Sequence, residues 1–141
     1  MATQDLVELT KESVALDVDT INSDTTTNGN SVDMTGYQSV MFAYFTGSYT
    51  DGDYEPQVEH ADDDGAGSPD TWNAVSDSDL LPTGTGQEAS RSLGAANAID
   101  QIGYRGTKKW VRLSIVSTST STGATVGAVV IQGHPSNSND S

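Results

Sequence analysis

The sequence contains no cysteine, and only six of its 141 residues are lysine or arginine. The absence of cysteine excludes a disulfide framework, a thiolate nucleophile and a thiolate-ligated metal. Twenty acidic residues give a formal net charge of −14, which opposes contact with the phosphates of nucleic acid. No apolar run approaches the roughly 18 residues of a membrane span, and the N-terminal segment lacks the apolar core of a secretory signal. We therefore expect synthesis in a cytoplasm, with neither nucleic acid nor membrane as a partner.

The composition favours strands and loops over helices. Hydrophobic residues make up 34% of the chain, and serine, threonine and glycine contribute 17, 17 and 14 residues. Apolar and polar residues repeatedly alternate with a period of two, whereas a helical period does not persist beyond the first dozen residues. The sequence therefore predicts an all-β, single-domain β-sandwich or jelly roll of about seven to eight strands over residues 13–133. Residues 1–12 are expected to form an N-terminal arm, and residues 134–141 a mobile tail.

The N-terminal third contains two predicted strands separated by a polar run. Val14, Leu16 and Val18 alternate with polar residues and predict a half-buried first strand. The Thr/Asn/Gly-rich run 25–31 predicts a loop. Residues 39–46 are apolar on both faces and are therefore expected to form a central strand.

The middle of the chain predicts a hairpin around an acidic turn. Residues 54–61 alternate before the turn at 62–70, and residues 71–75 are expected to return as a strand with Trp72 pointing inward. The segment 80–93 contains proline and glycine and predicts a surface excursion.

The C-terminal third carries the clearest alternation. Residues 110–116 and 124–132 are separated by a polar linker, which predicts a long hairpin. The bulkiest apolar side chains of the predicted strands are expected to meet between two sheets: Phe42, Tyr44, Trp72, Val111, Leu113 and Ile115.

Charge is segregated along the chain. No lysine or arginine occurs between residues 12 and 90, and ten acidic residues lie between Asp51 and Asp79. Four of the six basic residues form what we call the basic cluster: Arg105, Lys108, Lys109 and Arg112. One interpretation is a solvated acidic loop and ordinary basic residues beside a strand. The alternative is a two-sided module whose basic cluster binds acidic groups of a partner subunit.

Motifs for catalysis or metal binding are weak. The acidic residues could form carboxylate pairs, but they lie in Gly/Ser-rich stretches typical of wet loops, where the pKa of a carboxyl group is not raised. The two histidines, His60 and His134, fall on a strand and in the tail. The segment Asp62-Asp63-Asp64-Gly65 lacks the spacing of an EF-hand, but the sequence leaves a calcium loop of another type as an alternative. We predict no enzymatic activity, no catalytic residues, no cofactor and no resident metal.

Four segments together resemble a known family: residues 37–45, residues 58–75 with the acidic turn and Trp72, residues 102–113, and residues 127–135. Their order resembles the decoration, or cement, proteins of tailed-bacteriophage heads. The resemblance implies a non-enzymatic jelly-roll protein on the outer surface of the virion capsid. Such a protein bridges neighbouring subunits of the major capsid protein and stabilises the head. It also implies a homo-oligomer, with a trimer favoured over a dimer, made in the host bacterial cytoplasm.

The alternative function is a glycan-binding β-sandwich module of a phage tail or fibre. In that case Trp72, Tyr49 or Tyr54 would be exposed and would stack on sugar rings. The same aromatic side chains, if buried, would instead belong to the core.

Overall fold

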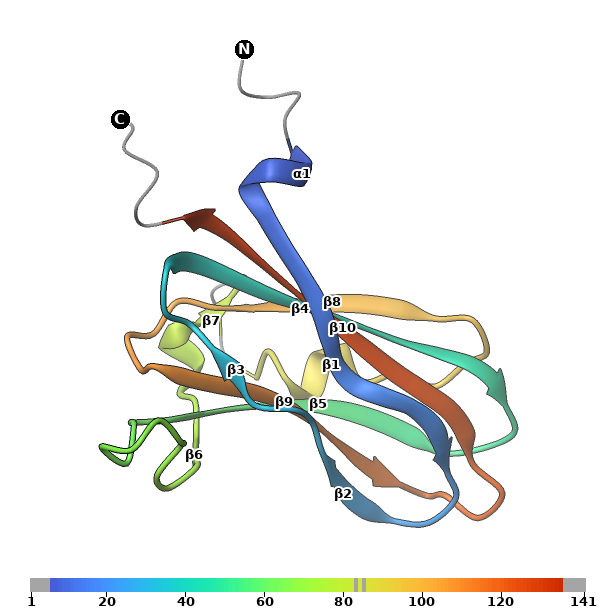
Figure 1. Ribbon diagram of the computed structural model, residues 1–141. Coiled ribbons are helices and arrows are strands. Elements are labelled where there is room, and N and C mark those ends of the chain that lie inside the picture. Colours follow the sequence, from blue (N-terminus) through green and yellow to red (C-terminus); the bar gives the residue numbers. More distant parts are fainter. Residues whose placement is uncertain (1–5, 83, 85, 136–141) are drawn as a thin grey trace.

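Strands dominate the computed structural model, which describes residues 6–82, 84 and 86–135 (Figure 1). The elements in chain order are α1 (Leu6–Leu9), β1 (Thr10–Ile21), β2 (Thr25–Asn28), β3 (Val32–Asp33), β4 (Tyr37–Tyr49), β5 (Asp53–Ala61), β6 (Asn73–Ala74), the 3₁₀ turn η2 (Asp77–Asp79), β7 (Leu80–Leu81), the 3₁₀ turn η3 (Ala89–Arg91), β8 (Ile99–Tyr104), β9 (Trp110–Thr118) and β10 (Ala124–Pro135). Among the described residues, no helix is long and apolar enough to cross a membrane.

The strands form two antiparallel sheets that pack face to face (Figure 1). Sheet I has the strand order β1-β10-β4-β8-β7, and sheet II has the order β2-β9-β5-β6, with β3 also beside β9. Because β2 and β3 pair with successive parts of β9, they act as one interrupted strand. With β7 as a short edge addition, the interleaved order is that of an eight-stranded jelly roll. The predicted fold class is confirmed.

The core lies between the two sheets and contains most of the predicted side chains. Phe42 and Tyr44 of β4 and the alternating Val111, Leu113 and Ile115 of β9 all have 0% of their surface exposed. The strand predicted at 39–46 is confirmed as central, since β4 lies between β10 and β8.

The prediction that Trp72 and its strand point into the core is wrong. The returning strand consists of only two exposed residues, Asn73 and Ala74, and Trp72 is half-buried outside the sandwich, where the guanidinium of Arg112 lies 4.4 Å from its ring centroid. An aromatic ring can bury much of its surface against an arginine, so a tryptophan next to a strand need not face the core.

Strand β1 departs from the predicted alternation. Its register with β10 shifts between Val14 and Leu16 and again between Leu16 and Asp19. The bulges turn both Ala15 and Leu16 inward, and Val14 and Val18 are 53% and 59% exposed on the outer side. Each bulge inserts one extra residue and therefore reverses the faces of all the residues that follow it.

The run 25–31, predicted to be a loop, begins with a strand. Thr25 to Asn28 pair with Ser117 to Ser114 of β9. Threonine is β-branched and suits a strand, and its polarity fits this edge of sheet II, where most of β2 is exposed.

The predicted C-terminal hairpin is also wrong, because β9 and β10 lie in opposite sheets. Both strands are buried centrally, and each needs two neighbours, so the linker crosses from one sheet to the other. The carboxylate of Asp51 holds this linker by accepting backbone N–H groups of Ser121, Thr122 and Gly123 at 2.9–3.2 Å. These hydrogen bonds lower the pKa of Asp51.

The segment 80–93 is more than a surface excursion. Leu80 and Leu93 are buried, and Leu93 exchanges backbone hydrogen bonds with Tyr54 of β5. The carboxylate of Glu88 accepts the backbone N–H of Val58 at 2.6 Å. Residues 88–93 therefore cover part of the edge of β5, which would otherwise expose unpaired backbone groups.

Of the predicted arm, residues 6–9 form α1 and residues 10–12 already pair with β10. Residues 1–5 lie outside the described residues. Of the predicted tail, His134 and Pro135 end β10, and residues 136–141 lie outside the described residues.

Candidate interaction site

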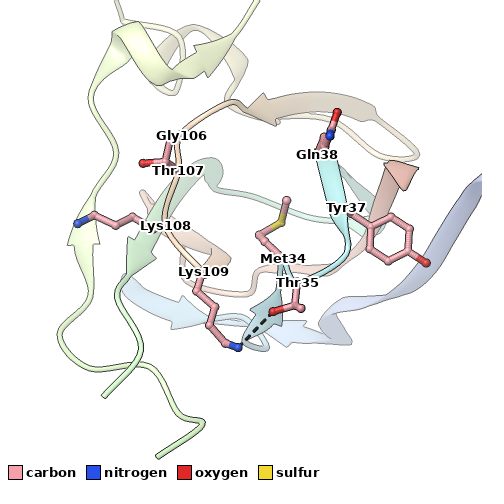
Figure 2. Close-up of a pocket in the computed structure, with 8 residues that line it drawn as sticks. All are labelled: Met34, Thr35, Tyr37, Gln38, Gly106, Thr107, Lys108 and Lys109. Carbon is pink, nitrogen blue, oxygen red and sulfur yellow. Dashed lines mark hydrogen bonds between the residues drawn. The ribbon is translucent and has the colours of Figure 1, made fainter. Parts of the chain in front are cut away.

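A hollow of about 470 Å³ opens between the turn that joins β3 to β4 and the loop that joins β8 to β9 (Figure 2). Its lining comprises Met34, Thr35, Tyr37, Gln38, Gly106, Thr107, Lys108 and Lys109. The two segments are tied together by the backbone N–H of Met34, which donates to the carbonyl of Lys109 at 2.8 Å. The hollow therefore lies between two segments that are about 70 residues apart in the sequence.

Two members of the basic cluster lie at this hollow. The Nζ of Lys109 donates to Thr35 Oγ1 at 3.2 Å and lies 3.9 Å from Asp33 Oδ1 (Figure 2). The Nζ of Lys108 lies 3.0 Å from Asp62 Oδ2. Because both pairs are more than a third exposed, solvent screens them and each contributes little to stability. Another carboxylate could replace Asp62 or Asp33 at small cost.

The other two members of the basic cluster do not line the hollow. Arg112 lies on the outer side of sheet II, where its Nε is 2.8 Å from Glu59 Oε1 and its side chain is mostly buried. The Nε of Arg105 donates to the backbone carbonyl of Ser78 at 3.1 Å. The structure therefore brings Lys108 and Lys109 together and gives Arg105 and Arg112 separate contacts within the chain.

The acidic turn beside the hollow is organised by its own carboxylates. Asp63 Oδ1 accepts the indole N–H of Trp110 at 3.1 Å, and Asp63 Oδ2 accepts the backbone N–H of Gly65 at 2.9 Å. The hydrogen bond from Trp110 is the main reason that the pKa of Asp63 is lowered. Within the described residues, no three acidic or histidine side chains are gathered to hold a metal ion.

His60 and Tyr104 connect sheet II to the loop that carries Lys108. The Tyr104 hydroxyl accepts the backbone N–H of Lys108 at 3.2 Å and lies 2.8 Å from His60 Nδ1. This geometry fits a neutral imidazole that accepts the hydroxyl proton. Burial lowers the pKa of His60, and the charge of Lys108 lowers it further, whereas Asp79 and Asp62 oppose the shift.

We expect the His60 interaction to make stability depend on pH. Because the pKa of His60 is lower in the folded chain than in the unfolded one, the unfolded chain takes up the proton first as the pH falls below about 6.5. Unfolding free energy should therefore decrease between pH 7.5 and 5.5, and less so in a His60→Gln variant. Denaturant unfolding at pH 7.5 and at pH 5.5 measures this decrease in unfolding free energy. An equal decrease in the wild type and in His60→Gln would contradict the prediction.

The aromatic side chains proposed for sugar stacking are mostly in the core. Tyr54 is fully buried, and Tyr49 packs edge-on against it with ring centroids 6.4 Å apart. Trp72 keeps part of its surface exposed, but the guanidinium of Arg112 lies over its ring. Two of the three proposed stacking side chains are therefore committed to packing.

The sequence predicted interacting residues on one wall of the hollow and none on the other. The charges of Lys108 and Lys109 drew attention to the loop after β8. The opposite wall, residues 34–38, carries no charge and no recognisable motif. Its one signal is Gly36, whose φ of +89° marks a tight turn.

No protein-family model matches the sequence, and no curated protein shows significant similarity to it. Among solved structures, the chain is similar to one in the structure of infectious bursal disease virus Gx strain, with 13% identity and a TM-score of 0.48 over 89% of this chain and 32% of that chain. It is also similar to PirA, with 11% identity and a TM-score of 0.41 over 89% and 94% of the two chains. The SPBc2 prophage-derived protein YomS shows 11% identity and a TM-score of 0.39 over 86% and 92%. The chain spans about a third of the length of the viral chain. These similarities are too distant to carry a functional argument.

Proposed function

We propose that the chain is a non-enzymatic structural protein of a bacteriophage virion, which decorates the outside of the head. In this role it stabilises the head by bridging neighbouring subunits of the major capsid protein. The observation that carries the proposal is the pair of lysines at the rim of the hollow, in a jelly roll that is otherwise strongly acidic.

The rim of the hollow suits attachment to an acidic surface. Lys108 and Lys109 are held by exposed ion pairs that a partner carboxylate can replace. Thr107 and Gln38 add neutral hydrogen-bonding groups to the lining. If two such contacts reach two capsid subunits, the second contact becomes intramolecular, so that modest interfaces give strong retention.

Two partly buried carboxylates, those of Glu88 and Glu59, support a role without catalysis. Burial raises the pKa of Glu88, as a general acid would require, but its oxygen accepts the backbone N–H of Val58 at 2.6 Å and holds residues 88–93 on β5. Glu59 is paired with Arg112 and also accepts the hydroxyl of Ser114. Both groups are therefore committed to the packing of the chain.

The Lys108→Glu and Lys109→Glu variants are expected to rebind more slowly to phage heads from which the protein has been stripped. Exposed charges at an interface act mainly on the association rate, so we expect about a tenfold decrease at low salt and a smaller one at high salt. Light scattering or surface plasmon resonance at two salt concentrations measures both rates. Lys11→Glu is the matched control, because it changes the net charge equally from a position on β1.

Two outcomes would contradict the proposal. Equal association rates for the three variants would show that the hollow is not part of the interface with the head. Failure of the wild-type chain to rebind heads at any salt concentration would exclude decoration. Quenching of Trp72 fluorescence by host glycans, together with that failure, would favour a glycan-binding tail or fibre module.

A further inference from the structure

The outer face of sheet I is nearly free of charge. Phe42 and Tyr44 of β4 point into the core, so the alternating Met41, Ala43 and Phe45 point outward. Residues paired directly across neighbouring strands share a face. We define the neutral face as Met41, Ala43 and Phe45, the residues paired with them across sheet I, and Val18, whose Cγ2 lies beside the outer side of Gly127. The paired residues are Gly127, Val129 and Ile131 of β10, Glu12 and Val14 of β1, Ile99, Gln101 and Gly103 of β8, and Leu81 of β7.

Apolar residues from all the long strands of sheet I contribute to the neutral face. β10 contributes Val129 and Ile131, β1 contributes Val14, and β8 contributes Ile99. Glu12, at the margin on β1, is the one charged residue in these rows. In a chain with twenty acidic residues, this distribution separates the neutral face from the remaining surface.

The margins of the neutral face are strongly exposed. Val14 and Val18 on β1 are 53% and 59% exposed, and Ile99 on the far side is 68% exposed. Beside β7, Met41 and Leu81 line a second hollow of about 230 Å³. An exposed and largely apolar surface of this kind marks an interaction site rather than an ordinary solvated face.

The size and shape of the neutral face indicate what covers it. Strands about 4.8 Å apart and a rise of about 3.3 Å per residue give this side of sheet I an area on the order of 700 Å². A stable protein interface buries about 800 Å² on each partner. The whole face must therefore be engaged, and only a surface of similar size can engage it.

A second copy of this chain meets this requirement. Its own neutral face is of equal size, and two twisted sheets pack face to face at about 10 Å with their strands nearly aligned. Approach through most other surfaces would bring acidic residues of two chains with a charge of −14 together, whereas the neutral face brings only Glu12. A self-complementary face produces a two-fold dimer.

We propose that the neutral face is a homodimer interface, on which a second copy packs its own neutral face about a two-fold axis. This dimer differs from the trimer that the sequence resemblance implies. It uses a surface other than the hollow with Lys108 and Lys109, so it leaves that hollow available to a different partner.

Light scattering after size-exclusion chromatography tests the proposal on the full chain in the absence of phage heads. The wild type is expected at twice the chain mass of 14.7 kDa. Val14→Lys and Ile99→Lys should each weaken the dimer at least tenfold, because a lysine ammonium would be desolvated in the interface. Both substitutions lower the net negative charge, so long-range repulsion cannot account for the loss.

Thr26→Lys is the matched control, because Thr26 is an exposed position on β2 of sheet II. It should remain dimeric, and all three variants should retain the wild-type circular dichroism spectrum. A wild-type chain at one or three times the chain mass would overturn the proposal. A dimer that persists in both neutral-face variants would overturn it as well. Because heads are absent, these outcomes are independent of the decoration experiment.

Discussion

Replacing Phe42 with alanine is expected to lower the free energy of unfolding by about 3–5 kcal/mol. The side chain lies between the two sheets with 0% of its surface exposed. Its truncation removes buried apolar surface and leaves a cavity, since a packed core relaxes only partly. This loss is a large share of the roughly 5–15 kcal/mol that keeps a domain folded. Urea-induced unfolding followed by tryptophan fluorescence measures it.

Phe45→Ala provides the control on the same strand. Phe45 has the same side chain but points outward and is only partly buried, so at a protein concentration at which the chain is monomeric we expect a loss of about 1 kcal/mol. Equal losses for the two variants would show that β4 does not separate a core face from an outer face. A thermal melt of Phe42→Ala that matches the wild type would contradict the assignment of the core.

The sequence was most informative where strands have neighbours on both sides. The alternation of Val111, Leu113 and Ile115 in β9 and of Phe42 and Tyr44 in β4 survives in the structure, because an undisturbed strand keeps a period of two. The jelly-roll class follows from several such strands without helical connections.

Other features depend on contacts that no local pattern encodes. The bulges of β1 are set by its register with β10, which lies more than 100 residues away. The position of Trp72 depends on Arg112, and the separation of β9 from β10 depends on which strands compete for each edge. The charge pattern revealed Lys108 and Lys109, but their pairing with Asp62 and Asp33 arises only when distant loops meet.

Gly29→Ala is expected to destabilise the chain by about 3 kcal/mol, at the upper end for overpacking. Gly29 follows β2 at the interruption before β3, and a Cβ there would collide with the backbone carbonyl oxygens of Leu113 in sheet II and Ala15 in sheet I. The next residue, Asn30, donates its backbone N–H to Ala15 at 2.8 Å and its side-chain amide to the carbonyl of Val14 at 3.0 Å. This segment therefore joins the two sheets along the β1 edge.

The cause of this effect is steric, because Gly29 does not adopt a left-handed φ. The obstructing atoms belong to the backbone of two strands, so relief requires β1 or β9 to move, and β9 is central. Gly47→Ala is the control: a Cβ there would contact only the Thr125 side chain, at 3.8–3.9 Å, and alanine suits a strand better than glycine by about 0.5–1 kcal/mol. Chemical denaturation should therefore show Gly47→Ala at or above wild-type stability and Gly29→Ala well below it. If both variants unfold at the wild-type midpoint, β1 and β9 do not approach each other at Gly29, and the two sheets must close along this edge by other contacts.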